Sequence, residues 1–141
     1  MFSKYRATAG LLALAFGIGY MAGRESPVAA QSQGRVLEIR TYVTPDKTGL
    51  DALVTRMRSE STIFDRIGMK SVAYFVAADA PKSENTFIYI LSHESRERAK
   101  ENWSRFGADS EWKELRSTSA PTGRLQIESV FVNPTDFSPV K

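Results

Sequence analysis

The chain has 141 residues and no cysteine, so one domain is expected, and disulfides, thiolate nucleophiles and cysteine-bound metals are excluded. The chain has 19 basic and 16 acidic residues, of which three basic residues and one acidic residue lie in the first 30. The rest of the chain therefore holds 16 basic and 15 acidic residues, a net charge of +1. A surface with the two charges so evenly mixed gives no electrostatic footprint for nucleic acid, and we expect no nucleic-acid partner.

The first 30 residues have the pattern of a targeting segment. Two basic residues stand near the start, an uncharged and largely apolar stretch follows over 7–23, and small residues precede Gln31. We expect a cleaved signal and a secreted or periplasmic protein. The alternatives are an uncleaved anchor over 7–23, which alone would bring the protein to a membrane, and a mitochondrial presequence.

The spacing of apolar residues predicts strands and helices over most of the remaining chain. In the first helix, Thr48 is expected to be the N-cap, with Asp51 in the first turn, and Gly68 is expected to end it. Asp109 is expected to cap the last helix. The expected elements, in chain order, are a strand over 36–43, a helix over 48–67, strands over 71–77 and 86–91, helices over 96–106 and 110–117, and a strand over 124–132.

The order β-α-β-β-α-β predicts an α+β, ferredoxin-like domain over 36–133, between a linker at 31–35 and a tail at 134–141. Its four-stranded antiparallel sheet would carry the helices on one face. Because the other face also carries apolar residues, two sheets are expected to press together into a dimeric α/β barrel. Such packing would bury Tyr42 and one face of the strand that contains Tyr74, so the expected partner is a second copy of the chain.

One face of the first strand carries charged and phenolic side chains. Strand alternation places Glu38, Arg40 and Tyr42 on the same side, about 7 Å apart along the strand. If Ile39 faces the helices, this trio lines the interior of the barrel, where Arg40 could hold an anion. Alternatively, Arg40 is structural and pairs with Glu38 or Glu128.

His93 is the single histidine of the chain and follows the third expected strand. It could act as a general base or a haem ligand, or it could be a surface histidine at the end of a strand. We include His93 and Tyr74 with the first-strand trio as candidate ligand-binding residues. One histidine and no cysteine argue against a metal site, and no cofactor is expected. Trp103 and Trp112 could stack on a planar ligand or pack in the core.

Several short segments, in order along the chain, match a known family pattern. They are Glu38-Ile39-Arg40-Thr41-Tyr42, Gly68-Met69, Glu94-Ser95 with Arg98-Ala99, Asp109 with Glu111-Trp112, and Phe137-Ser138-Pro139. Together they resemble the NIPSNAP family over about residues 36–140, and they depart from it at Ser110, where the family pattern leads us to expect proline. The resemblance implies a ferredoxin-like subunit and a homodimeric barrel, and it implies no settled enzymatic activity.

Two functions follow from the sequence. The first is a module that binds a small apolar or anionic molecule, or another protein. The second is a cofactor-independent monooxygenase-like enzyme that acts on an aromatic or lipophilic substrate in the barrel. A cleft that contains His93 together with Arg40 or Tyr74 would favour the enzyme, and a cleft filled by side chains would favour the module.

Overall fold

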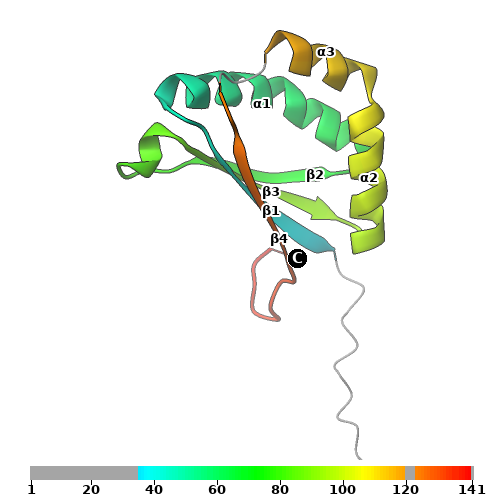
Figure 1. The fold of residues 1–141 in the computed structure, drawn as a ribbon. Coiled ribbons are helices and arrows are strands. Elements are labelled where there is room, and N and C mark those ends of the chain that lie inside the picture. The colour runs from blue at the N-terminus through cyan, green and yellow to red at the C-terminus, as the bar shows by residue number, and fades with distance from the viewer. Residues whose placement is uncertain (1–34, 120–122, 141) are drawn as a thin grey trace, which may run out of the picture. The chain divides into compact units, whose positions relative to one another are not determined.

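The computed structural model describes residues 35–119 and 123–140, which form four strands, three α-helices and a short 3₁₀ turn (Figure 1). The predicted signal segment, and all but the last residue of the predicted linker, lie outside the described residues. The elements are β1 (Val36–Val43), α1 (Lys47–Ile67), β2 (Lys70–Val76), the 3₁₀ turn η1 (Lys82–Glu84), β3 (Thr86–His93), α2 (Arg96–Ala108), α3 (Ser110–Thr118) and β4 (Gln126–Val132).

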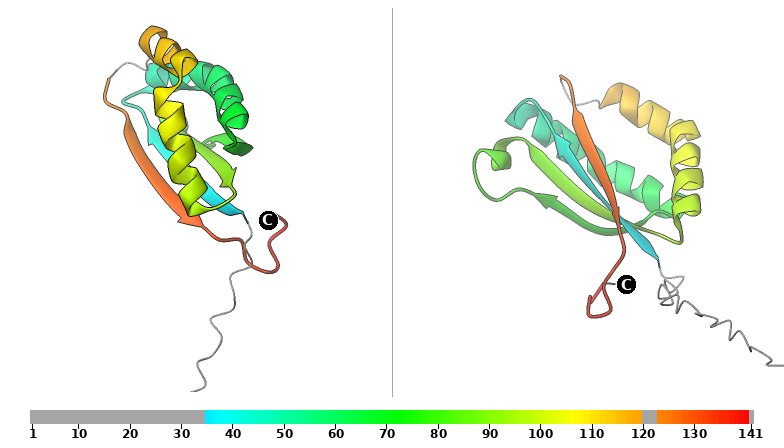
Figure 2. Two further views of the ribbon diagram at one scale, coloured as in Figure 1. Left: turned by 90° about the vertical axis from the view of Figure 1, so that its right-hand side faces the viewer. Right: turned by 60° about the horizontal axis from the view of Figure 1, so that its bottom comes forward.

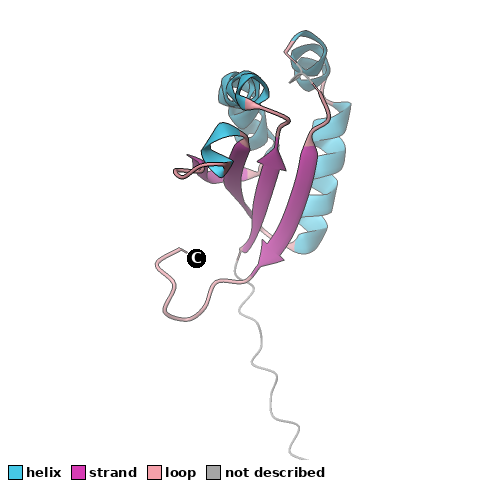
Figure 3. Cartoon of the chain, turned by 60° about the vertical axis from the view of Figure 1, so that its left-hand side comes forward, coloured by secondary structure: helices cyan, strands magenta, loops and turns pink. Residues whose placement is uncertain are grey.

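The strands form one antiparallel sheet in the order β2-β3-β1-β4, as the ferredoxin-like pattern predicts. All three α-helices lie on the same side of this sheet (Figures 2 and 3). The α+β fold expected from the sequence is therefore confirmed. In the described part of the chain, no helix is both long and apolar enough to cross a membrane.

The caps of α1 are partly as predicted. Gly68 ends the helix in a left-handed conformation, with φ of 100°, and its N–H donates to the carbonyls of Phe64 and Asp65. The N-cap, however, is Asp46 rather than Thr48. Asp46 has extended backbone dihedrals, and its carboxylate accepts from the Gly49 N–H at 2.8 Å. Because the helix begins earlier than predicted, Asp51 lies beyond its first turn.

Other boundaries differ from the prediction by a few residues. β3, for example, continues two residues further, to His93, because its last residues still pair with β1, where His93 lies opposite Val36. A single residue, Asp109, separates α2 from α3. It ends α2 and caps α3 by accepting from the Trp112 N–H at 3.1 Å. Ser110, where proline was expected, is simply the first residue of α3.

The hydrophobic core lies between the sheet and α1, with α2 closing one side. Leu50, Leu53 and Phe64 of α1 are almost fully buried against Tyr89 and Leu91 of β3. The ring of Phe64 stacks on that of Tyr89 at 5.8 Å between centroids, and further aromatic contacts continue into α2 and α3. This aromatic core packs α1 and α2 against the sheet.

The structure corrects the expected orientation of β1. Glu38, Arg40 and Tyr42 do share one face, but the register aligns them with Leu91, Tyr89 and Phe87, beneath the helices. Ile39 faces the other way. We call the sheet surface away from the helices the open face, and its larger apolar residues are Ile39, Val43, Phe75, Ile88, Ile90 and Val130.

Candidate functional site

A buried carboxylate organises the polar interior beneath α2. The Glu38 side chain is 1% exposed. Its Oε2 accepts from His93 Nε2 at 2.9 Å and Trp103 Nε1 at 2.8 Å. Its Oε1 accepts from Ser129 Oγ at 2.6 Å and Arg40 Nη1 at 2.9 Å. One side chain of β1 is thus bonded to β3, β4 and α2, and we call this set of five residues the Glu38 network.

The network holds Glu38 in its charged form. Burial by itself would raise the pKa of the carboxyl group. Hydrogen bonds from His93, Ser129 and Trp103, together with the positive charge of Arg40, outweigh burial and lower the pKa from 4.5 to about 2. Glu38 is therefore an anion at neutral pH and acts as the acceptor at the centre of the network.

Arg40 is held from two sides. Besides the bond from its Nη1 to Glu38, its guanidinium lies over the Trp103 ring at 4.3 Å and near the Tyr42 ring at 5.6 Å. Its side chain is 17% exposed, and its buried Nε has no hydrogen-bond partner among the described residues. The expectation that Arg40 lines the open face is wrong. The alternative, in which Arg40 pairs with Glu38, is the one observed. The long arginine side chain spans the distance of about 7 Å between same-face residues of a strand.

His93 is buried rather than on the surface. Its side chain is 0% exposed, and its Nε2 bonds to Glu38 while Nδ1 has no partner among the described residues. A carboxylate only accepts, so Nε2 of the ring carries a proton and donates it to Glu38. Its sequence neighbour Glu94 is exposed and lies 3.7 Å from Arg98 instead.

Tyr42 and Tyr89 form a second buried polar contact, with their hydroxyl groups 3.0 Å apart. Burial raises the pKa of Tyr89 well above 10, so this hydroxyl stays protonated. Tyr74 lies on the far side of Tyr89, on which it stacks at 5.9 Å, and its hydroxyl bonds to Ser71 Oγ at 2.6 Å. Four of the five predicted site residues therefore lie together, and Tyr74 belongs to a different site.

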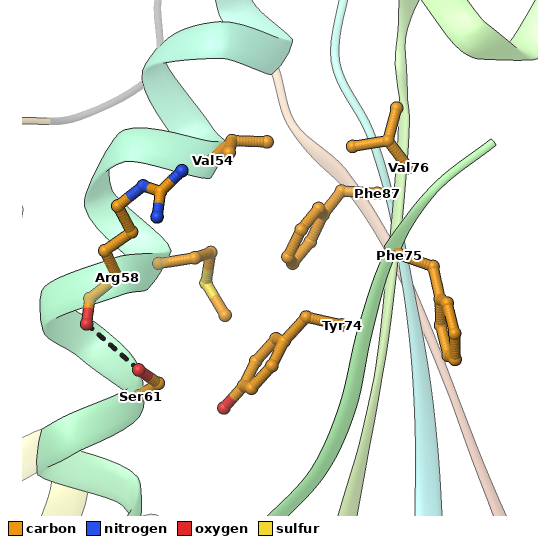
Figure 4. Close-up of a pocket in the computed structure, with 8 residues that line it drawn as sticks. Val54, Arg58, Ser61, Tyr74, Phe75, Val76 and Phe87 are labelled. Carbon is orange, nitrogen blue, oxygen red and sulfur yellow. Dashed lines mark hydrogen bonds between the residues drawn. The ribbon is translucent and has the colours of Figure 1, made fainter. Parts of the chain in front are cut away.

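That second site is a pocket of about 310 Å³ between α1 and β2 (Figure 4). Val54 of α1 faces Phe87 across it, whereas the Phe75 side chain points away to the open face. We call this space the α1–β2 pocket. It is lined by Val54, Met57, Arg58, Ser61, Tyr74, Phe75, Val76 and Phe87.

The sequence alone did not predict the hydrogen bonds of the Glu38 network. Trp103 and Ser129 join the Glu38 network from 65 and 91 residues along the chain, a distance over which no local pattern carries information. Glu60 does leave a signal in the sequence, because it is a charged residue that interrupts the row of apolar residues along α1. Glu60 is buried and bonds to Arg56 four residues earlier, at 3.0 Å, an arrangement that the i, i+4 spacing permits.

Among residues 35–119 and 123–140, no group of three metal-ligating side chains is placed to hold a metal ion.

Comparison with known proteins gives the family. The sequence profile of the NIPSNAP family matches residues 37–139, which is most of the chain. This chain belongs to the NIPSNAP family. No sequence among curated proteins matches it.

Solved structures agree with this assignment. A NIPSNAP family protein of unknown function from Agrobacterium tumefaciens is 22% identical, with a TM-score of 0.63 over 78% of this chain and 96% of its own. An uncharacterised NIPSNAP-like domain protein from Burkholderia xenovorans is 21% identical, with a TM-score of 0.60 over 76% and 90%. SnoaB, a cofactor-independent oxygenase from Streptomyces nogalater, is 10% identical, with a TM-score of 0.52 over 75% and 98%. At these identities the likeness concerns the fold alone.

Proposed function

We propose that this NIPSNAP protein is a homodimeric module that binds a small, largely apolar molecule in the α1–β2 pocket. The observation that carries the proposal is the pocket itself. Its volume of about 310 Å³ is at the lower end of the range for small-molecule sites, about 300–1,000 Å³. Val54, Met57 and Phe87 give it apolar walls, and burial of a ligand against them supplies the driving force.

The Glu38 network supports a binding module over an enzyme. A general base must come within hydrogen-bond reach of the proton it removes. His93 and Glu38 are closed off from solvent and already bonded to each other. The α1–β2 pocket contains Tyr74 but neither His93 nor Arg40. The constellation that would favour a monooxygenase-like reaction is therefore not gathered in this pocket, and the likeness to SnoaB supports the fold only.

The open face supports the homodimer. Its apolar residues come from all four strands, and Phe75 and Val130 on the two edge strands are about half exposed. An exposed apolar surface of this extent is usually covered by a partner. A second copy of the same sheet offers a matching apolar surface, and two stacked sheets pack about 10 Å apart.

We further propose that the protein is exported and loses its first 30 residues. The basic start, the uncharged stretch over 7–23 and the small residues before Gln31 support this. The mass of the intact protein recovered from the exported fraction should correspond to a chain that begins at Gln31. A full-length mass in the membrane fraction would instead indicate a retained anchor.

Filling the pocket should abolish binding. In Val54→Trp, the indole is expected to occupy the space between α1 and β2, so that the neutral probe 1-octanol loses at least about tenfold in affinity. Titration of 1-octanol, followed by calorimetry and by the NMR signal of the Met57 methyl group, measures this. Thr55→Trp places the same side chain on the exposed side of the same helix and should leave binding unchanged.

Overpacking alone can destabilise a protein by about 1–3 kcal/mol, so thermal melts of both variants accompany the titrations. A wild-type protein whose Met57 signal does not shift saturably with 1-octanol would overturn the proposed function. Equal binding by wild type and a folded Val54→Trp variant would place the binding site elsewhere.

A further inference from the structure

Arg58 stands apart from the other basic residues of α1. Lys47 pairs with Asp51, Arg56 with Glu60, and Arg66 with two acidic residues beyond the helix. The guanidinium of Arg58 has no hydrogen bond or ion pair to any residue in the described ranges. It is exposed, and it lines the α1–β2 pocket (Figure 4).

The sequence explains why Arg58 has no partner on its own helix. Side chains three and four positions away are its helical neighbours. These positions are Val54 and Thr55 on one side and Ser61 and Thr62 on the other, so no carboxylate is within reach along α1. The cation is thus available at the pocket without competition from an intrahelical acid.

The other polar groups of the pocket are already bonded. Ser61 Oγ donates to the Arg58 carbonyl oxygen at 3.0 Å, and the Tyr74 hydroxyl shares a hydrogen bond with Ser71 Oγ. The remaining lining side chains, such as Val54, Met57 and Phe87, are apolar. Arg58 is therefore the strong donor left over for a ligand, at the side of an otherwise apolar space.

We propose that the α1–β2 pocket binds a small amphipathic monocarboxylate, with its carboxylate on the Arg58 guanidinium and its apolar part between Met57 and Phe87. This inference rests on the proposed function and specifies its ligand class. A guanidinium presents planar paired donors that match the two oxygens of a carboxylate. One cation in an apolar pocket balances one negative charge, which favours a single carboxylate over a doubly charged phosphate.

A matched pair of probes tests the ligand class. Octanoate and 1-octanol have the same chain length and differ in the charge of the head group. Wild-type protein is expected to bind octanoate roughly three- to fivefold more tightly than 1-octanol, the gain typical of a solvent-accessible ion pair. Added salt should shrink that preference, because exposed charges are screened.

Arg58→Gln should remove the preference for octanoate, so that the variant binds octanoate no more tightly than 1-octanol. Arg116→Gln is the matched control, because Arg116 is also exposed and has no ion pair in the described part of the chain, but it does not line the pocket. It should bind both probes as wild type does.

The outcomes separate this inference from the proposed function. Equal affinity of the wild-type protein for the two probes, or a preference that persists in Arg58→Gln, would overturn the monocarboxylate inference while the apolar binding pocket stands. Failure of both probes to bind would overturn both. A preference lost equally in Arg116→Gln would show a general charge effect and would also overturn the role of Arg58.

Discussion

Replacement of Glu38 with alanine is expected to lower the free energy of unfolding by about 3–5 kcal/mol. The substitution removes the acceptor of four hydrogen bonds and leaves the Arg40 charge without its counter-ion in a largely buried position. The indole N–H of Trp103 and the Nε2–H of His93 would also lose their partner, and each buried donor left unsatisfied adds to the cost.

Denaturant unfolding at one protein concentration measures this effect. Glu94→Ala is the matched control, because Glu94 is an exposed glutamate next to His93 whose closest cation is Arg98, at 3.7 Å. Exposed pairs of this kind contribute at most about 1 kcal/mol, so the control should unfold close to wild type. A Glu38→Ala variant as stable as Glu94→Ala would show that the Glu38 network does not stabilise the fold.

The pH dependence of unfolding provides a second measure of the same group. The pKa of Glu38 is lowered from 4.5 to about 2 on folding, so the unfolded state takes up a proton first as the pH falls. The contribution of Glu38 is therefore fully present above about pH 4.5 and declines as the pH falls to about 2. Wild type should lose stability relative to Glu38→Ala through this window. A constant difference between the two would contradict the lowered pKa.

The sequence predicted the elements of this fold well and the faces of β1 poorly. Strand alternation correctly placed Glu38, Arg40 and Tyr42 together. It could not decide which face the helices cover, because Ile39 on the other face is as apolar as a core residue should be. In a central strand, both faces can carry apolar residues, because one face packs against the helices and the other can pack against a further layer.

The polar residues of β1 can lie in the interior because distant segments of the chain supply their hydrogen-bond partners. The side chains of Trp103 and Ser129 reach Glu38 from an α-helix and an edge strand, and their spacing in sequence gives no hint of this contact. The α1–β2 pocket was equally hidden, since it depends on how far α1 stands from β2. The absence of an acidic neighbour for Arg58, by contrast, can be read directly from the sequence.

The second large effect concerns the proposed dimer. Val130→Glu is expected to convert the homodimer into a monomer, because it places a charge on the open face, where the second sheet would exclude water. Ile127→Glu provides a closely matched control. Both residues lie on β4 and are about equally exposed, 47% for Val130 and 50% for Ile127, but the register directs them to opposite faces of the sheet.

Light scattering at micromolar concentration should give a dimer mass for wild type and Ile127→Glu, and a monomer mass for Val130→Glu. Loss of the partner would also expose the apolar residues around Ile39 and Ile90, so the monomer should unfold at a lower denaturant concentration than wild type. A monomeric wild type would refute the dimer outright. If Val130→Glu remains dimeric and folded, the subunits meet through another surface, and the open face must be covered in a different way.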